Sequence, residues 1–345
     1  MKSMQLTGLR RTSLFDVPEP AVRMDTDVKI RMQAVGVCGS DVHYYTTGRI
    51  GSQVVQYPFP VGHEGAGYVT ETGSAVQGLR AGDRVAIEPA MPCGACDQCL
   101  SGRPHTCRKL RFLGCPGQAD GCLSEFIVMP QHSCIPFPEG MSFEQAAVSE
   151  PLAIGLYAIR LAGAVSGKRV AVLGSGPIGL SVLSAARLAG AEAVYMTDPI
   201  EERLSVARQS GATATFNPVR EDVVTNIAAR EPLLMDFVVE CCGRQKALDQ
   251  AIRLLKPGGT LLIVGIPSFS RFSFPVDDLR RKEIAIRNVR RQNGCDREAI
   301  RVIADGSVSV DHWITHRFPL EECREAFNLV ADYRDGVVKA MIHFP

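Results

Sequence analysis

The sequence predicts an α/β protein of two domains, a β-rich domain followed by a domain built on a doubly wound parallel sheet. Up to about residue 150, short apolar runs are separated by turn-rich stretches such as GSAVQGLRAGDR. Beyond that point, buried strands alternate with helices, as a parallel sheet requires. The 345 residues, 46% hydrophobic and 22% charged, are enough for two cores. No apolar run approaches the roughly 18 residues of a membrane-spanning helix.

The individual elements follow from local patterns. In the first domain, apolar residues alternate from Val28 to Ala34, which predicts a strand that ends before Cys38, and VAIEP indicates another. In the second domain the predicted strands are KRVAVLG, AVYMTD, DFVVECCG and GTLLIVGIP, and the predicted helices are PIGLSVLSAARLAG, EERLSVARQSGA and ALDQAIRLLKPGG. The last segment, from about residue 290 to 345, lacks this alternation, and we expect it to return to the first domain.

Four closely spaced cysteines, Cys93, Cys96, Cys99 and Cys107, predict a structural zinc site, because four thiolates on one short loop can surround one ion. An iron–sulfur cluster is disfavoured, since the spacing to Cys107 and the absence of a following proline differ from the bacterial pattern. Disulfides are disfavoured because the chain opens without an apolar signal segment, which favours a reducing cytoplasm. A net charge of +1 argues against a nucleic-acid-binding zinc ribbon. We expect most of the other cysteines to be small core residues.

A glycine-rich turn between a predicted strand and helix predicts a dinucleotide site of the Rossmann type. The turn is Gly174-Ser-Gly176-Pro177-Ile178-Gly179, and the amides at the start of the helix would bind a pyrophosphate. Asp198 ends the next strand, and we expect it to accept hydrogen bonds from the adenosine ribose, which favours NAD over NADP. Arg203 could instead receive the NADP phosphate, so NADP stays open. We also place Gly265 at the cofactor.

A second metal site is predicted from residues that are unremarkable singly. Cys38 and the adjacent pair His63 and Glu64 supply thiolate, imidazole and carboxylate donors ahead of the nucleotide-binding region. An incomplete protein ligand set is typical of a catalytic zinc, which keeps one position open for water or substrate. We therefore expect two zinc ions per chain.

Together these features resemble the zinc-dependent medium-chain dehydrogenases of the polyol (sorbitol and xylitol) type, over essentially the full length. The resemblance rests on VGVCGSDVHYYTTGRIG, PFPVGHEGAGYV, CGACDQCLSGRPHTC, SEPLAIGLYA, VLGSGPIGL with TDP, VRRQN and THRFPL. It implies a GroES-like catalytic domain of residues 1–151 completed by 289–345, and a Rossmann NAD-binding domain of residues 152–288. It also implies that Glu150 is the fourth, acidic zinc position, direct or through water, where alcohol dehydrogenases usually have cysteine.

The resemblance further implies a reaction, in which zinc acts as a Lewis acid on a secondary hydroxyl and hydride passes to C4 of the nicotinamide. Ser40 and His43 would relay the proton, unless water and Glu150 take it. Tyr44, Phe59 and Phe112 are expected to line the substrate pocket. Relatives have an Arg-Tyr pair near the substrate where this chain has Arg291 and Gln292, so the shape of the pocket differs. Animal sorbitol dehydrogenases generally lack the four-cysteine lobe, so the chain is closer to microbial or plant relatives.

Oxidation of a sorbitol-, xylitol- or galactitol-class polyol to the ketose is therefore the predicted activity, with zinc and NAD as cofactors. L-Threonine or simple secondary alcohols are the alternative substrates, and a zinc-free reductase or a non-enzymatic zinc-binding interaction protein are the alternative classes of protein. We expect a small-molecule substrate, no nucleic-acid or membrane partner, a cytoplasmic location, and a homo-oligomer, which by resemblance is a tetramer.

Overall fold

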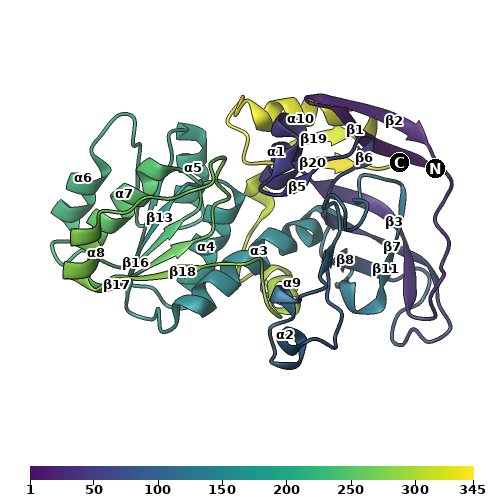
Figure 1. The fold of residues 1–345 in the computed structure, drawn as a ribbon, viewed down its shortest axis with the longest axis horizontal. Helices are drawn as coiled ribbons and strands as arrows, with labels where there is room; N and C mark the ends of the chain where they lie inside the picture. Colours follow the sequence, from purple (N-terminus) through teal and green to yellow (C-terminus); the bar gives the residue numbers. More distant parts are fainter. The chain divides into compact units, whose positions relative to one another are not determined.

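The computed structural model describes all residues 1–345 and divides them into two compact units, shown as ribbons in Figure 1. The first unit contains residues 1–150 and 296–345, and the second contains residues 151–295. Residues 289–295, which the sequence analysis assigned to the first domain, belong to the second unit. One long helix, α3 (Phe143–Ala162), contributes to both units. No helix has the length and apolar character needed to cross a membrane.

A seven-stranded sheet forms the core of the first unit, in the order β12-β8-β7-β3-β20-β19, with β11 also paired to β3. The last strand, β20, runs antiparallel to β3, so the C-terminal segment is part of this sheet. These strands are β3 (Asp27–Gly36), β7 (Glu64–Thr72), β8 (Arg84–Ile87), β11 (Phe126–Pro130), β12 (Cys134–Pro136), β19 (Ile314–Pro319) and β20 (Lys339–His343).

Shorter ladders and helices surround this sheet. The remaining strands of the first unit are β1 (Lys2–Gly8), β2 (Arg11–Asp16), β4 (Arg49–Ile50), β5 (Gln53–Val54), β6 (Phe59–Pro60), β9 (Ala90–Met91) and β10 (Arg111–Phe112). Its helices are α1 (Gly39–Thr47), α2 (Asp97–Leu100), α9 (Asp296–Ala304) and α10 (Cys323–Ala331), with 3-10 turns at Pro104–Thr106, Gln131–Ser133, Asp311–Trp313 and Leu320–Glu322. The buried core joins β3, β7 and α10 through residues such as Ile30, Val69 and Phe327.

Six parallel strands form the sheet of the second unit, in the order β15-β14-β13-β16-β17-β18. The strands are β13 (Arg169–Leu173), β14 (Ala193–Thr197), β15 (Ala214–Phe216), β16 (Met235–Glu240), β17 (Leu255–Ile263) and β18 (Ala285–Asn288). The helices are α4 (Pro177–Leu188), α5 (Glu201–Gln209), α6 (Val223–Arg230), α7 (Gln245–Leu254) and α8 (Val276–Lys282). This sheet and the β-rich first unit confirm the predicted fold class.

The predicted end of one helix was wrong. The helix expected to continue through KPGG ends at Leu254, and Lys256 and Pro257 belong to β17. A proline disfavours the helical conformation of the residue before it, which ends the helix early. Lys256 is also held to the neighbouring strand, because its Nζ lies 2.5 Å from Oδ1 of Asp236.

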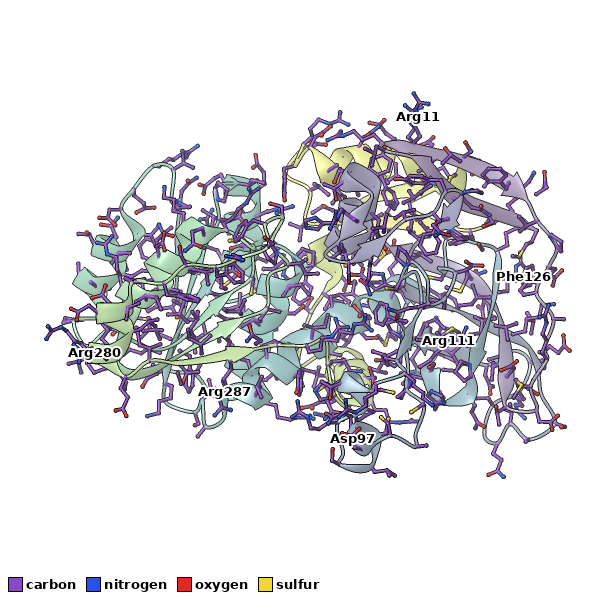
Figure 2. The ribbon with its side chains drawn as sticks, in the orientation of Figure 1. Arg11, Asp97, Arg111, Phe126, Arg280 and Arg287 are labelled. Carbon is purple, nitrogen blue, oxygen red and sulfur yellow. The ribbon has the colours of Figure 1, made fainter.

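Most cysteines outside the predicted metal sites are buried, as expected: Cys115, Cys122, Cys134, Cys295 and Cys323. Cys241 is partly exposed, and Cys242 is exposed because it follows the end of β16. Figure 2 draws all side chains, and the labelled Arg280 and Arg287 belong to the second unit, where α8 has no buried residue and all of β18 is exposed.

Candidate functional site

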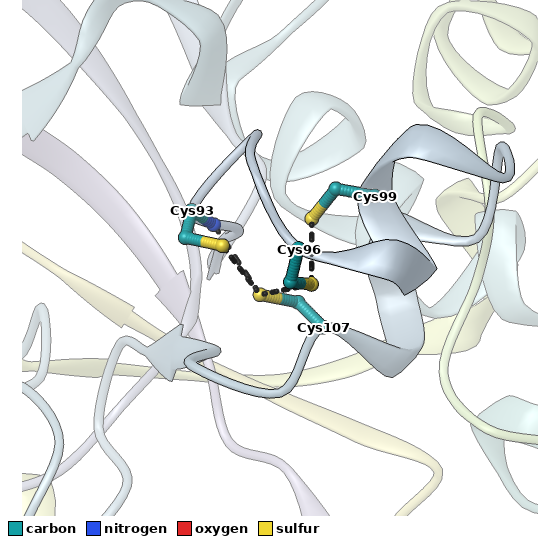
Figure 3. Close-up of side chains that lie close together, drawn as sticks. All are labelled: Cys93, Cys96, Cys99 and Cys107. Carbon is teal, nitrogen blue, oxygen red and sulfur yellow. Dashed lines mark hydrogen bonds between the residues drawn. The ribbon is translucent and has the colours of Figure 1, made fainter.

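The four cysteines of the predicted structural zinc site converge in the structure, with their sulfurs turned toward one another (Figure 3). The Sγ atoms lie 3.5 Å apart for Cys93 and Cys107, 3.6 Å for Cys96 and Cys99, and 3.8 Å for Cys96 and Cys107. A tetrahedron with Zn–S bonds of about 2.3 Å has edges of about 3.8 Å. The donors therefore fit a tetrahedral zinc ion. We call residues 92–110, which contain them, the cysteine lobe.

Backbone amides make the cysteine lobe favourable for thiolates. The amides of Cys93 and Lys109 both lie 3.3 Å from Sγ of Cys107. Amide hydrogen bonds, first from Arg108 and then from Cys99, lower the pKa of Cys96 to about 6, whereas burial and the neighbouring thiols raise the pKa of Cys99 to about 12. Four sulfurs at these distances cannot all ionise without a cation to balance their charge.

The second predicted donor set is also assembled. Donor atoms of Cys38, His63 and Glu64 lie within 4.8 Å of one another. Cys38 is the residue before α1, where the helix N-terminus favours an anionic group, and Glu64 begins β7. The two strands next to this donor set, β3 and β7, pair with each other, and Gly36 at the end of β3 lies opposite Glu64. Thiolate, imidazole and carboxylate donors match a catalytic zinc, and three of them leave one position open.

His63 is held in place by a buried carboxylate that the sequence analysis missed. Asp41 is fully buried, and its Oδ1 lies 3.3 Å from Nδ1 of His63 and accepts a hydrogen bond from the amide of Gly62. Burial alone would lower the pKa of His63, but the charges of Asp41 and Cys38 raise it well above its usual range. A carboxylate that orients an imidazole ligand is the common arrangement around protein-bound metals.

Glu64 has a buried partner from the other end of the chain. Nζ of Lys339, on β20, lies 2.5 Å from Oε2 of Glu64 and 3.2 Å from the carbonyl of Val37, and only 2% of the lysine is exposed. A buried ion pair is stable only when its geometry and hydrogen bonds replace the lost hydration. Lys339 therefore fixes the orientation of the Glu64 carboxylate beside the donor set.

The other predicted residues of this site differ in how close they lie to it. Oγ of Ser40 donates to Sγ of Cys38 over 3.3 Å, and His43 follows one turn later in α1. Glu150, in α3, is outside the group of donors within 4.8 Å, but its charge acts on Lys339. The ring of Phe112 contacts that of His63, with centroids 5.3 Å apart.

The two remaining aromatic residues of the predicted pocket are buried in the first unit. Tyr44 and Phe59 are 4% and 8% exposed, and the Tyr44 hydroxyl lies 3.1 Å from Oε1 of Gln53 and 3.7 Å from Sγ of Cys115. Both belong to the core of that unit. Their contact with a substrate stays a prediction.

The glycine-rich turn of the second unit has the geometry that its sequence predicts. Gly174 has a φ of 108°, which only glycine adopts easily, and a Cβ at Gly179 would lie 1.8 Å from the carbonyl oxygen of Gly174. Gly176 precedes α4, and Pro177 and Ile178 form its first turn. A helix of this length with open amides at its start is suited to a pyrophosphate.

Asp198 directly follows the neighbouring strand, β14, and its carboxylate contacts this turn. Its Oδ2 accepts from the amide of Ser175 over 2.9 Å, and its Oδ1 accepts from the amide of Ile200 over 3.0 Å. Burial raises the pKa of Asp198, and the charge of Arg203 acts in the opposite direction. Arg203 is itself buried, and its guanidinium lies 3.7 Å from where a Cβ of Gly176 would be. Asp198, which would bind the ribose hydroxyls of NAD, and Arg203, which would bind the 2'-phosphate of NADP, are thus neighbours.

The other predicted residues of the second unit lie at strand ends and in the segment after β18. Gly265 follows β17, where a Cβ would lie 2.4 Å from the amide of Gly243. Arg291 has a φ of 54°, and Gln292 is buried, with Oε1 accepting from the amide of Cys295 over 2.8 Å. Their contact with a substrate stays a prediction.

Family models of known proteins match both parts of the chain. Residues 24–139 match the alcohol dehydrogenase GroES-like domain, and residues 177–305 match the zinc-binding dehydrogenases. The chain is 34% identical to sorbitol dehydrogenase of Bacillus subtilis (strain 168), covering 99% of this chain and 97% of the relative. It is also 34% identical to D-xylulose reductase A of Aspergillus oryzae, covering 95% and 93%.

A solved structure shares the whole fold. A zinc-binding dehydrogenase from Sinorhizobium meliloti 1021, in complex with NADP, has a TM-score of 0.91 and 32% identity over 99% of this chain and 98% of its own. The chain belongs to the zinc-dependent medium-chain dehydrogenases, the family that its sequence resembles. Within that family it is an enzyme of the polyol dehydrogenase type that acts on a CH–OH group, with zinc and a nicotinamide dinucleotide as cofactors.

Proposed function

We propose that this enzyme oxidises a secondary hydroxyl of a polyol of the sorbitol, xylitol or galactitol class to the ketone, with NAD as the hydride acceptor, and that the reaction is reversible. The observation that carries the proposal is the donor set of Cys38, His63 and Glu64 within 4.8 Å. An acidic residue, Glu150, acts on Lys339, the partner of Glu64, and stands where alcohol dehydrogenases usually have a cysteine. The names of the full-length relatives, sorbitol dehydrogenase and D-xylulose reductase, support the substrate class.

Each side chain has a role in this proposal. Cys38, His63 and Glu64 would hold the catalytic zinc, Asp41 orients His63, and Lys339 orients Glu64. Glu150 lies outside the tight donor group and would act through a water molecule. Bound zinc supplies the Lewis acidity that lowers the pKa of a substrate hydroxyl.

The proton of the hydroxyl must leave before hydride is transferred. Ser40 lies beside Cys38, and His43 lies one turn further along α1. We infer that Ser40 accepts the proton and that His43, which is partly exposed, passes it to solvent. Oxidation of the substrate releases one proton and delivers two electrons and a second hydrogen to NAD as hydride.

A substrate panel tests the proposed reaction. Sorbitol, xylitol, galactitol and ribitol are compared with 2-propanol and L-threonine by kcat/KM at saturating NAD, and the ketose products are identified by mass spectrometry. The proposal expects the highest kcat/KM with a polyol. A higher kcat/KM with L-threonine or 2-propanol than with every polyol would overturn it.

The preference for NAD is assigned to Asp198, whose carboxylate would repel a 2'-phosphate. Because both oxygens also bind backbone amides, Asp198→Asn, which keeps one acceptor, is more informative than Asp198→Ala. Hydrogen bonds to a charged group contribute about 1.5–3 kcal/mol, so the NAD-to-NADP ratio of kcat/KM should fall about tenfold or more. Glu202→Gln, on the exposed first turn of α5, is the control. An unchanged ratio in Asp198→Asn would assign the preference elsewhere, with Arg203 the first candidate.

We also infer a reducing, cytoplasmic location, which is supported by all twelve cysteines being free thiols.

A further inference from the structure

The cysteine lobe is the loop of a very short hairpin. β9 leads into the lobe and β10 leads out of it, with Met91 paired to Arg111 and Ala90 paired to Phe112. A ladder of only two residue pairs is not stable by itself. Cys93 and Cys107 come together at the base of the loop, with sulfurs 3.5 Å apart. A metal ion held by these cysteines would therefore fix the register of β9 and β10.

The second strand of this hairpin ends against the other donor set. Phe112 is 8% exposed, and its ring packs on the 5% exposed ring of His63, with centroids 5.3 Å apart and planes inclined by 56°. The amide of the next residue, Leu113, donates to the carbonyl of Pro89 over 3.0 Å, which ties the strand back to the start of β9.

His63 is thus held from two directions. Asp41 binds its Nδ1, and Phe112 covers its ring. If Phe112 shifted, the imidazole of His63 would lose one of these two restraints. Metal binding would then have to fix the orientation of the imidazole, which would weaken the binding. Loss of a group that orients a metal-binding histidine typically lowers metal affinity about 10–100-fold.

We propose that the cysteine lobe controls how tightly the Cys38, His63 and Glu64 site holds its metal, and that Phe112 is the positioning residue that transmits this control. The inference rests on the two metal sites of the proposed function. A filled lobe holds β10 in register, β10 holds Phe112 on His63, and the restrained imidazole binds metal more tightly.

A double-mutant cycle tests the proposal. The proteins are the full-length parent, Cys96→Ser, Phe112→Leu and the double variant, each with its far-ultraviolet circular dichroism recorded. The probe is Co²⁺, whose dissociation constant at the Cys38 site is measured by chelator competition and whose visible spectrum distinguishes a mixed donor set from four thiolates. Phe126→Leu is the control, since Phe126 lies on β11 beside Lys29.

Each single variant should raise the dissociation constant for Co²⁺ about tenfold or more, and the double variant should be no weaker than the weaker single variant. Phe126→Leu should leave the constant within about twofold of the parent value. Unchanged binding in Cys96→Ser, or effects that multiply in the double variant, would overturn the proposal.

The experiment also distinguishes a folding defect from a wrong site assignment. If Cys96→Ser fails to fold, Cys93→Ser, whose cysteine is exposed, replaces it in the cycle. If the parent binds Co²⁺ only with a four-thiolate spectrum, the site assignment of the proposed function fails, and this inference fails with it. A mixed-donor spectrum with multiplying effects refutes the coupling alone.

Discussion

Lys339 is a buried charge that interacts with several acidic groups. Burial would lower its pKa, but the charges of Glu64 and Cys38, the hydrogen bond to Glu64, and the charge of Glu150 raise it, so the side chain stays an ammonium ion. Cys38, Glu64 and Glu150 all act on this one ammonium group. A divalent cation at the Cys38 site would attract the same acidic groups, so the lysine and the metal would act together on the same charges.

We therefore expect Lys339→Met to destabilise the metal-free protein more than the zinc-loaded protein. Removing one member of a buried ion pair costs about 3–5 kcal/mol, because the other charge stays buried. Zinc would compensate part of this loss by binding Glu64. The measurement is thermal unfolding of both forms, with Lys29→Met as the control, since Lys29 pairs with the exposed Glu19. Equal destabilisation with and without zinc would show that Lys339 has no link to the metal site.

Glu150→Gln should lower kcat/KM for the best polyol about tenfold or more, because a carboxylate that acts on a bound water loses its charge. The affinity for NAD should stay within about twofold, since the dinucleotide-binding turn belongs to the other unit. Steady-state kinetics and a fluorescence titration with NADH provide the two readouts. The exposed Glu139, changed to Gln, is the control. Unchanged kcat/KM in Glu150→Gln would mean that the carboxylate takes no part in the reaction.

At the scale of elements, a carboxyl pair joins two distant segments of the first unit. Glu88, after β8, is hydrogen-bonded to Asp296, the first residue of α9, and burial together with this pairing raises the pKa of Glu88 well above its ordinary value. The folded protein therefore holds a proton on Glu88 at pH values where the unfolded chain, with a pKa of about 4.3, has released it.

Because the pKa of Glu88 is raised in the folded state, Glu88 should contribute less to the stability of the protein as the pH rises. Between about pH 4.5 and the raised pKa, the folded state binds more protons, so the free energy of unfolding falls with pH by up to about 1.4 kcal/mol per unit. Glu88→Gln keeps an acceptor for the Ala90 amide and a donor toward Asp296, and should remove this slope. Urea unfolding from pH 5 to 8 measures it. A difference between variant and parent that stays constant with pH would contradict the shifted pKa.

Elements whose cause is local were predictable from the sequence. The glycine turn, the strands of the parallel sheet and the four cysteines are each specified by residues close in sequence. The structure contains all three features. The end of α7 was missed because one proline outweighed an otherwise helical pattern. These features set the class of protein but not the details of its site.

Asp41 and Lys339 were missed because their partners are distant in sequence or hidden by a neighbouring motif. Asp41 lies in CGSD directly after Ser40, and this motif drew attention to the serine. A histidine that binds a metal usually has a carboxylate hydrogen-bonded to its other nitrogen, which is the signal for Asp41. Lys339 stands in the apolar stretch VVKAMI, where a lysine signals a buried carboxylate. The sequence could reveal that a partner exists, but only the pairing of β20 with β3 places it at Glu64.

At the scale of the whole molecule, one edge of the second unit's sheet is open. All four residues of β18 are exposed, and the strand ends the sheet order. An open edge presents unpaired amide and carbonyl groups that can pair with another chain. We propose that a second copy of the chain pairs with this edge about a two-fold axis, which would supply one interface of the expected homo-oligomer.

Ile286→Lys on this edge should therefore shift the protein toward smaller species, because a two-fold interface along β18 would bring two copies of the added charge close together. Ile286 is 36% exposed within one chain, so the change should leave the fold of that chain intact. Sedimentation velocity over a hundredfold range of concentration measures the distribution of species. Val219→Lys, at a residue that is 79% exposed outside the sheet, is the control. A monomeric parent protein would exclude an interface at β18. An oligomer that tolerates both substitutions would place the interface on another surface, and the short length of β18 would then be the feature that limits pairing at this open edge.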